Sequence, residues 1–180
     1  MRTLTIARVV AVGCVGLYAG ILLGDLAGPA QARPQLNPSS FVQLQQIIHA
    51  RYVFIMPALV AATVLAGLAW LVLIRSNRAV EFWLVAGSVA GVLFCLLLTR
   101  LVNVPLNDQL VTWSVAFPPP NVHELWMPWE GAHAIRTVVA VAAFVLAVVA
   151  LALATPPPPI VSDASEVSDA SEPGDRLEAD

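Results

Sequence analysis

One helical face in the last third of the chain carries residues of three kinds that could act together in a reaction. Trp129, His133 and Arg136 are spaced i, i+4 and i+7, so a helix places them in one row. The row joins an aromatic plate, an imidazole that titrates near neutral pH and a guanidinium that stays charged. The alternatives are a histidine that only satisfies a structural hydrogen bond and a tryptophan that belongs to an interfacial aromatic belt.

Further polar residues lie near the ends of the apolar segments. In an up-down-up-down bundle, the ends of the first and third helices meet the starts of the second and fourth. The residues predicted to meet there are Asp25, Gln46, His49, Arg51, Arg100, Asn103, Asn107, Glu130, His133 and Arg136. Charged side chains at membrane depth are costly, and they are usually paired or functional. We therefore expect the functional site at this end of the bundle.

The composition is that of an integral membrane protein. Hydrophobic residues make up 58% of the 180 residues and charged residues 12%, against about 25% charged residues in an ordinary soluble domain. Four apolar runs are long enough for the roughly 20 helical residues that cross a hydrocarbon core. We predict an all-α, up-down-up-down four-helix membrane bundle over residues 1–155, with spans at about 4–26, 52–74, 80–102 and 134–154.

The residues after the fourth span have a different composition. Residues 161–180 carry one Arg and seven acidic residues, and V-S-D-A-S-E occurs twice in tandem, at 161–166 and 167–172. A polar, acidic segment without aromatic residues cannot bury a core, so we predict a disordered tail over residues 156–180. The tail either aids solubility or serves as a segment that binds a protein partner or is phosphorylated.

Arginines at one end of the bundle determine the predicted orientation. Four spans put both termini and the turn at 75–78 on one side, which carries Arg2, Arg8, Arg75 and Arg78. The opposite side carries as many arginines, Arg33, Arg51, Arg100 and Arg136, but the last three belong to the polar cluster at the helix ends rather than to free loops. Because free loop arginines favour the cytoplasmic side, we predict a multi-pass protein of the cell membrane with both termini in the cytoplasm. The first apolar run also imitates a cleavable signal peptide, but its length favours a retained helix.

Several other kinds of site are not expected. The sequence has no basic patch for nucleic acid, no phosphate-binding loop and no serine nucleophile motif. Cys14 and Cys95 lie in separate apolar runs and belong to no C-x-x-C motif, so we predict buried thiols and no metal site.

Three short motifs follow one another before and at the start of the fourth span. They are N-x-P-x-N at 103–107, a tryptophan, and W-x-x-x-H-x-x-R at 129–136. In this order they resemble the anthrone oxygenase-like family of small four-span membrane proteins, and the resemblance covers roughly residues 4–155. Characterised fungal relatives oxidise anthrones to anthraquinones in polyketide pathways, without a dedicated redox cofactor. By motif position, the counterparts of the family's signature residues are Asn103, Asn107, Trp129, His133 and Arg136.

The resemblance implies a cofactor-independent oxygenase that draws an apolar phenolic or polyketide-like substrate from the bilayer. His133 would remove the acidic benzylic proton of an anthrone, and Arg136 would stabilise the developing oxyanion. These two are the predicted catalytic residues, and no cofactor is expected. The predicted substrate-binding residues are Asn103, Asn107, Trp129, His49 and Arg100.

Two other functions stay open on the sequence. A non-enzymatic membrane protein would use its acidic tail to bind a partner. A haem- or quinone-binding bundle would use His49 and His133, which start parallel helices at the same membrane level, with Arg51 and Arg136 available for the propionates.

Overall fold

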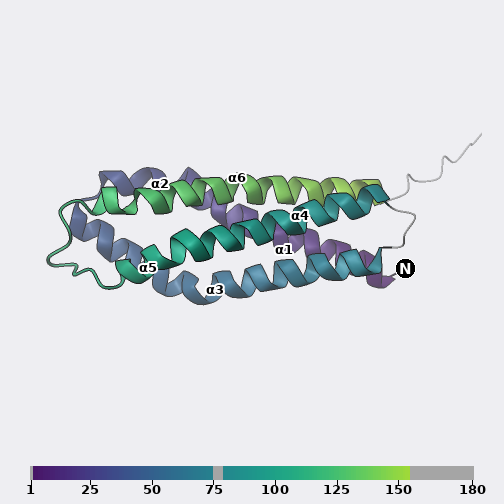
Figure 1. The fold of residues 1–180 in the computed structure, drawn as a ribbon, viewed down its shortest axis with the longest axis horizontal. Helices are drawn as coiled ribbons and strands as arrows, with labels where there is room; N and C mark the ends of the chain where they lie inside the picture. Colours follow the sequence, from purple (N-terminus) through teal and green to yellow (C-terminus); the bar gives the residue numbers. More distant parts are fainter. Residues whose placement is uncertain (1, 75–78, 155–180) are drawn as a thin grey trace, which may run out of the picture.

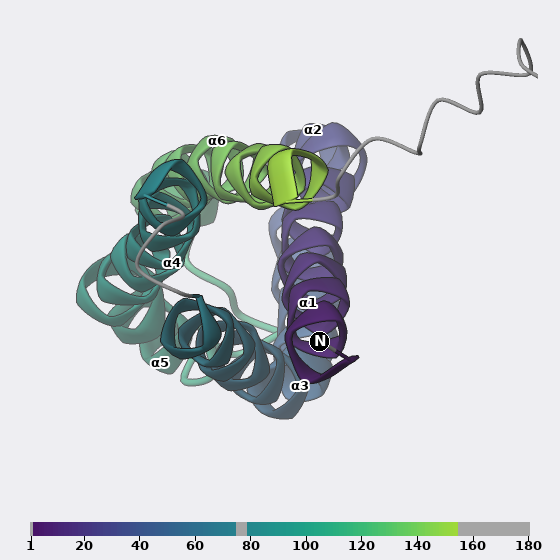
Figure 2. The ribbon, with the colours of Figure 1, turned by 90° about the vertical axis from the view of Figure 1, so that its right-hand side faces the viewer.

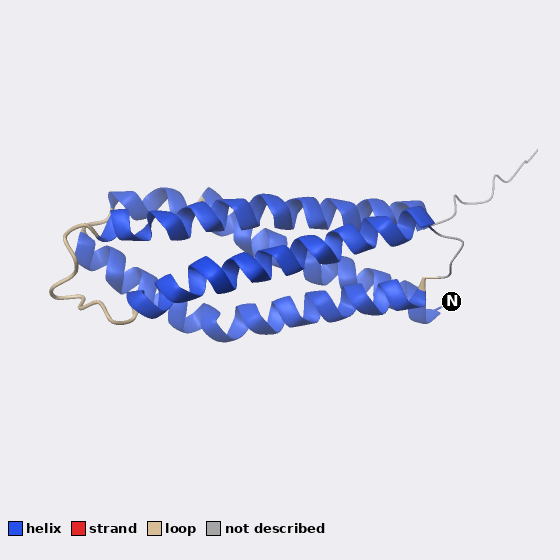
Figure 3. Ribbon diagram, in the orientation of Figure 1, coloured by secondary structure: helices blue, strands red, loops and turns tan. Residues whose placement is uncertain are grey.

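A computed structural model describes residues 2–74 and 79–154, and these residues are helical apart from short connections (Figure 1). No strand occurs within these two ranges (Figure 3). The elements are α1 (Arg2–Ala27), α2 (Pro29–Ala32), η1 (Arg33–Gln35), α3 (Pro38–Leu73), α4 (Ala79–Leu98), η2 (Thr99–Asn103), α5 (Val104–Leu110) and α6 (Val122–Ala154). The predicted all-α fold is confirmed. The predicted disordered tail at 156–180 lies outside the described residues.

Four helical segments of the described chain are long and apolar enough to cross a membrane. They comprise Arg2–Gln35, Pro38–Leu73, Ala79–Leu110 and Val122–Ala154. Viewed along the bundle, α1, α3, α4 and α6 form the corners of a four-sided arrangement in that cyclic order (Figure 2). The chain is therefore a multi-pass membrane protein.

The two ends of the bundle differ in their connections. The start of α1 and the end of α6 lie together at one end, which we call the termini end (Figure 1). The opposite end carries the connections 28–37 and 111–121, and we call it the loop end.

Two of the helices extend far beyond their apolar runs toward the loop end. Asn37 caps α3, because its side chain accepts a hydrogen bond from the backbone N–H of Ser40 at 2.9 Å. The helix α6 begins at Val122 and continues through Pro128. Polar residues that precede the predicted spans thus lie on regular helix, which fixes their faces and their mutual spacing.

Small residues allow the helices to approach closely in the membrane, where apolar burial gives helices no drive to associate. The inward face of α6 is lined by alanine, at positions 140, 143, 147, 150 and 154. A Cβ atom added to Gly67 of α3 would lie 2.6 Å from Val89 Cγ2 of α4. Small side chains thus set the helix spacing through the apolar part of the bundle.

The third span is interrupted where it reaches the loop end. A π-helical turn, η2, follows α4 directly and leads into α5. A π turn contains an extra residue, and such turns are frequent at functional sites. The extra residue rotates the face that α5 presents relative to α4. Asn103, in this turn, is buried with 1% of its surface exposed.

Candidate functional site

The aromatic and basic side chains of α6 form one column. Trp126 stacks on Trp129 with ring centroids 5.0 Å apart, and Trp129 stacks on His133 at 5.1 Å. The Arg136 guanidinium carbon lies 5.8 Å from the Trp129 ring centroid, within the range of a cation–π contact. Trp126, His133 and Arg136 are buried and Trp129 is half-buried. The column therefore places aromatic faces, an imidazole and a cation in contact.

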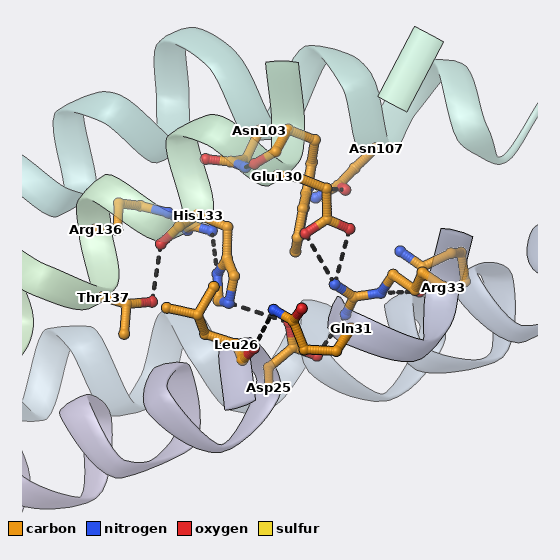
Figure 4. Close-up of polar contacts among 12 residues, drawn as sticks. Asp25, Leu26, Gln31, Arg33, Asn103, Asn107, Glu130, His133, Arg136 and Thr137 are labelled. Atoms are coloured by element: carbon orange, nitrogen blue, oxygen red, sulfur yellow. Dashed lines mark hydrogen bonds and ion pairs between the residues drawn. The ribbon is translucent and has the colours of Figure 1, made fainter. Parts of the chain in front are cut away.

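The imidazole of His133 is held between two charged side chains (Figure 4). Arg136 Nη2 lies 3.3 Å from His133 Nδ1, and Asp25 Oδ2 lies 3.1 Å from His133 Nε2 without a well-aligned hydrogen bond. Because a guanidinium only donates, Nδ1 must accept from Arg136. The hydrogen of a neutral His133 then lies on Nε2 and faces the carboxylate. Arg136 Nη1 also donates to Thr99 Oγ1 at 2.8 Å.

The π turn and α5 bring two asparagines against the column. Asn103 Nδ2 donates to the backbone oxygen of Trp129 at 3.2 Å. Asn107 Oδ1 accepts from Trp129 Nε1 at 2.9 Å. These two bonds hold both the backbone and the indole of Trp129, so the orientation of the aromatic face depends on the third span.

Arg33 connects the linker between α1 and α3 to the rest of the site. Its guanidinium donates to Gln45 Oε1 at 3.1 Å, to Glu130 at 2.9 and 3.1 Å, and to Asp25 Oδ1. The guanidinium carbon also lies 5.3 Å from the Trp129 ring centroid. Only 2% of the surface of Arg33 is exposed. A single buried cation therefore binds α1, α3 and α6 together beside the column.

Five buried polar atoms of the site have no hydrogen-bond partner among the described residues. Asp25 Oδ2 and His133 Nε2 face each other at 3.1 Å, and the other three, Asn103 Oδ1, Trp126 Nε1 and Arg136 Nε, belong to residues that contact Trp129. Leaving such a group unsatisfied costs about 1–3 kcal/mol, and native proteins contain few of them. Apart from the facing pair of Asp25 and His133, one acceptor and two donors thus remain available to a ligand beside Trp129.

The structure brings together five of the seven residues predicted for the site: Asn103, Asn107, Trp129, His133 and Arg136. It does not bring the other two to them. His49 is half-buried and Arg100 is exposed, and within the described ranges no hydrogen bond or ion pair joins either of them to the column. Arg100 lies in the π turn next to Thr99, which contacts Arg136, but its own side chain is exposed.

Arg33 is not among the site residues predicted from the sequence. It lies in a linker rich in Pro, Gly and Ala, where an arginine is usually solvated. Its ion pair with Glu130 spans 97 positions of the chain, so no local spacing announces it. The available signal was the scarcity of cations: the chain has nine arginines and no lysine, and Arg33 is one of four that lie near the polar end.

Comparison with known proteins gives one match. A family model described as Anthrone oxygenase matches residues 45–146, which is more than half of the 180 residues. The match includes α5 and the column on α6, and it begins after Asp25 and Arg33. No curated protein and no solved structure matches the chain.

Proposed function

This chain belongs to the anthrone oxygenase family, and we propose that it oxidises an apolar phenolic or polyketide-like substrate with molecular oxygen at the loop end of its bundle. The observation that carries the proposal is the group of unsatisfied polar atoms near Trp129. Family membership supports the reaction type, and the geometry supports this place for it. No dedicated redox cofactor is part of the proposal.

A phenolic ketone matches the chemistry of these unsatisfied atoms. Arg136 Nε and Trp126 Nε1 can donate to a carbonyl or phenolate oxygen, and Asn103 Oδ1 can accept from a hydroxyl group. Fused rings can pack against the side of the column that Trp126, Trp129 and His133 form. In this proposal, His133 and Arg136 are the catalytic residues, and Asn103, Asn107 and Trp129 bind the substrate.

The base becomes available when the substrate binds. In the unliganded arrangement, Arg136 covers the Nδ1 lone pair of His133. A substrate oxygen that takes over the hydrogen bond from Arg136 frees this lone pair to accept a benzylic proton. Arg136 then faces the oxygen on which the negative charge of the substrate anion accumulates.

The remaining chemistry needs only oxygen. The substrate anion adds to O2, and the proton held by His133 returns to the peroxide to give a hydroperoxide. Loss of the second benzylic proton with cleavage of the O–O bond leaves a ketone and water. One oxygen atom of O2 ends in the ketone and the other in water, and the four electrons taken up by O2 come from the methylene carbon.

Oxygen uptake by the purified full-length protein in nanodiscs, with a panel of anthrones and with ¹⁸O2, tests the proposal. We expect uptake above the spontaneous rate, with ¹⁸O in the new ketone of the product. Absence of catalysed uptake across the panel would contradict the proposal. A haem absorption band that shifts on reduction with dithionite would also contradict it, in favour of a haem protein.

Three broader assignments accompany the proposed activity. We propose that residues 1–155 form the membrane domain and that residues 156–180 form a separate acidic segment, which is available to a protein partner. We place the protein in the cell membrane with both termini in the cytoplasm, because Arg2 and Arg8 lie at the termini end. Reporter fusions at each terminus test the orientation, and deletion of 161–180 should leave oxygen uptake unchanged.

A further inference from the structure

The charges around His133 balance only when its imidazole is neutral. Two guanidinium groups, Arg33 and Arg136, and two carboxylates, Asp25 and Glu130, form the ionic part of the site. A fifth charge without a counter-ion in such a buried place would be costly. The donor-only Arg136 at Nδ1 leads to the same neutral state, because a protonated Nδ1 would face another N–H group.

The carboxylate of Asp25 is shared between two donors. Its Oδ1 accepts from Arg33 Nη2, and its Oδ2 lies 3.1 Å from His133 Nε2. Arg33 is itself fixed by Gln45 and Glu130, so it can hold the plane of the carboxylate. A chain of contacts thus runs from Arg33 through Asp25 to the imidazole.

We propose that Arg33 and Asp25 are positioning residues for His133, which hold its ring hydrogen on Nε2 and leave the Nδ1 lone pair for the substrate proton. The catalytic consequence rests on the proposed function, but the position of the ring hydrogen does not. Asp25 also lies where it stabilises the imidazolium that forms when Nδ1 takes a proton, as a carboxylate does behind a catalytic histidine. Arg33 acts on His133 only through Asp25.

Neither positioning residue belongs to the part of the chain that the family model matches, residues 45–146. Asp25 ends α1 and Arg33 lies in η1, so the first helix and its linker complete the site. This assignment therefore comes from the fold of this chain and extends the site beyond the matched residues.

Nitrogen NMR of the full-length protein with ¹⁵N-labelled histidine tests the proposal without any substrate. His133→Gln identifies the His133 signals among those of the three histidines. We expect a hydrogen on Nε2, a bare Nδ1, and slow exchange of the Nε2 hydrogen with water. A hydrogen on Nδ1, or on both nitrogens, at neutral pH would overturn the proposal.

Substitutions at two positions, 25 and 33, break the chain of contacts at different points. Asn at position 25 has one acceptor oxygen, so Asp25→Asn can satisfy only one of the two donors that flank it. Arg33→Gln removes the cation that orients the carboxylate, whereas Arg33→Lys keeps the charge without the fork of donors. We expect rapid exchange of the His133 Nε2 hydrogen in Asp25→Asn and Arg33→Gln, and a partial effect in Arg33→Lys. Wild-type exchange in both of the first two variants would overturn the proposal.

Two control variants distinguish a positioning effect on His133 from a general loss of stability. Gln45→Leu loosens the hold of Arg33 on α3 and leaves Asp25 in place, so it should lower the melting temperature with little change at His133. Arg51→Gln changes an exposed arginine of α3 and should change neither. If Gln45→Leu altered the His133 signals as strongly as Arg33→Gln, the effect would be a general loosening and the positioning role would be wrong.

Kinetics separate this inference from the proposed function. With an anthrone that the wild-type protein oxidises, Asp25→Asn and Arg33→Gln should lower kcat about 100-fold and leave KM close to its wild-type value, because neither side chain is proposed to touch the substrate. Retained kcat in both variants would refute the positioning role even if anthrone oxidation itself were established. If no anthrone is oxidised, the NMR result decides the inference alone.

Discussion

Two buried clusters at opposite ends of the bundle use the same kinds of residue but differ in how fully their polar atoms are satisfied. At the termini end, Glu81 Oε1 accepts hydrogen bonds from Arg8 Nε, Arg8 Nη2 and Trp70 Nε1 at 2.9, 2.6 and 2.8 Å. At the loop end, Trp126 Nε1 and Arg136 Nε have no hydrogen-bond partner in the described part of the chain. Each end thus combines arginine, carboxylate and tryptophan. The indole N–H of Trp70 has a hydrogen-bond acceptor, and that of Trp126 has none among the described residues.

The difference separates a structural connection from a binding site. Arg8, Trp70 and Glu81 come from α1, α3 and α4, so the termini-end cluster fastens three helices through one oxygen. The loop-end cluster also fastens helices through Arg33, but it leaves donors and an acceptor free beside Trp129. Buried charge alone therefore does not identify a site in this protein. The unsatisfied atoms identify it.

The largest expected effect is on turnover at the loop end. His133→Gln removes the proposed base, and a positioned base contributes about 10²–10⁴-fold, so we expect oxygen uptake to fall about 1,000-fold. Membrane insertion and the melting temperature should stay close to those of the wild-type protein. The exposed carboxylate of Glu124 on the same helix supplies the control, as Glu124→Gln should keep full turnover. Equal activity in the His133 and Glu124 variants would remove His133 from the mechanism.

A substitution in the termini-end cluster should lower the stability of the protein and leave its turnover unchanged. Glu81→Leu leaves Arg8 buried without this carboxylate, and breaking a buried pair costs about 3 kcal/mol or more in the free energy of unfolding. Turnover per folded molecule should not change. Unfolding with increasing SDS measures the loss. Adding Arg8→Met to Glu81→Leu should recover most of it, because an apolar pair no longer buries a lone charge. A double variant as unstable as the single one would show that the pair is not the cause.

The fold was predictable because membrane spans have a simple physical signature. Four apolar runs of sufficient length predicted the four-helix, all-α architecture, which the structure confirms. The helical spacing of Trp129, His133 and Arg136 predicted their common face, and the three do contact one another through rings and guanidinium. Both predictions use local periodicity only.

The rest of the site depends on contacts that local periodicity does not encode. Arg33 meets Glu130 across 97 positions, and Arg8 meets Glu81 across 73. From the sequence, Arg8 served only to orient the protein in the membrane, but in the structure it also holds Glu81. Arg100 lies in the π turn beside Thr99, yet Thr99 contacts Arg136 and Arg100 is exposed. Sequence spacing locates residues within one helix, and the packing of helices decides their partners.

Replacing Trp70 and Trp126, one in each cluster, compares the two ends of the bundle directly. The expected change in the free energy of unfolding is smaller than that for Glu81→Leu. Trp70→Phe and Trp126→Phe remove the same atoms from two buried indoles. Only Trp70 Nε1 donates to a carboxylate, at 2.8 Å. A hydrogen bond to a charged acceptor contributes roughly 2 kcal/mol, so we expect Trp70→Phe to be less stable than Trp126→Phe by about that amount in the SDS titration. Equal stabilities would mean that the two ends are alike. Conversely, only Trp126→Phe should weaken substrate binding, measured as a higher KM.

The smallest expected effect concerns Thr99 in the π turn, for which Thr63 of α3 is a matched control. Thr99 Oγ1 donates to the Cys95 oxygen and Thr63 Oγ1 donates to the Leu59 oxygen, each at 2.7 Å. Only Thr99 also accepts from Arg136, so Thr99→Val leaves one more guanidinium N–H unsatisfied than Thr63→Val does. We expect Thr99→Val to lower turnover about tenfold, because a misdirected Arg136 loses roughly 1.4 kcal/mol of anion stabilisation. Thr63→Val should have wild-type turnover. Equal turnover in the two variants would show that the hydroxyl group of Thr99 does not orient Arg136 for the reaction.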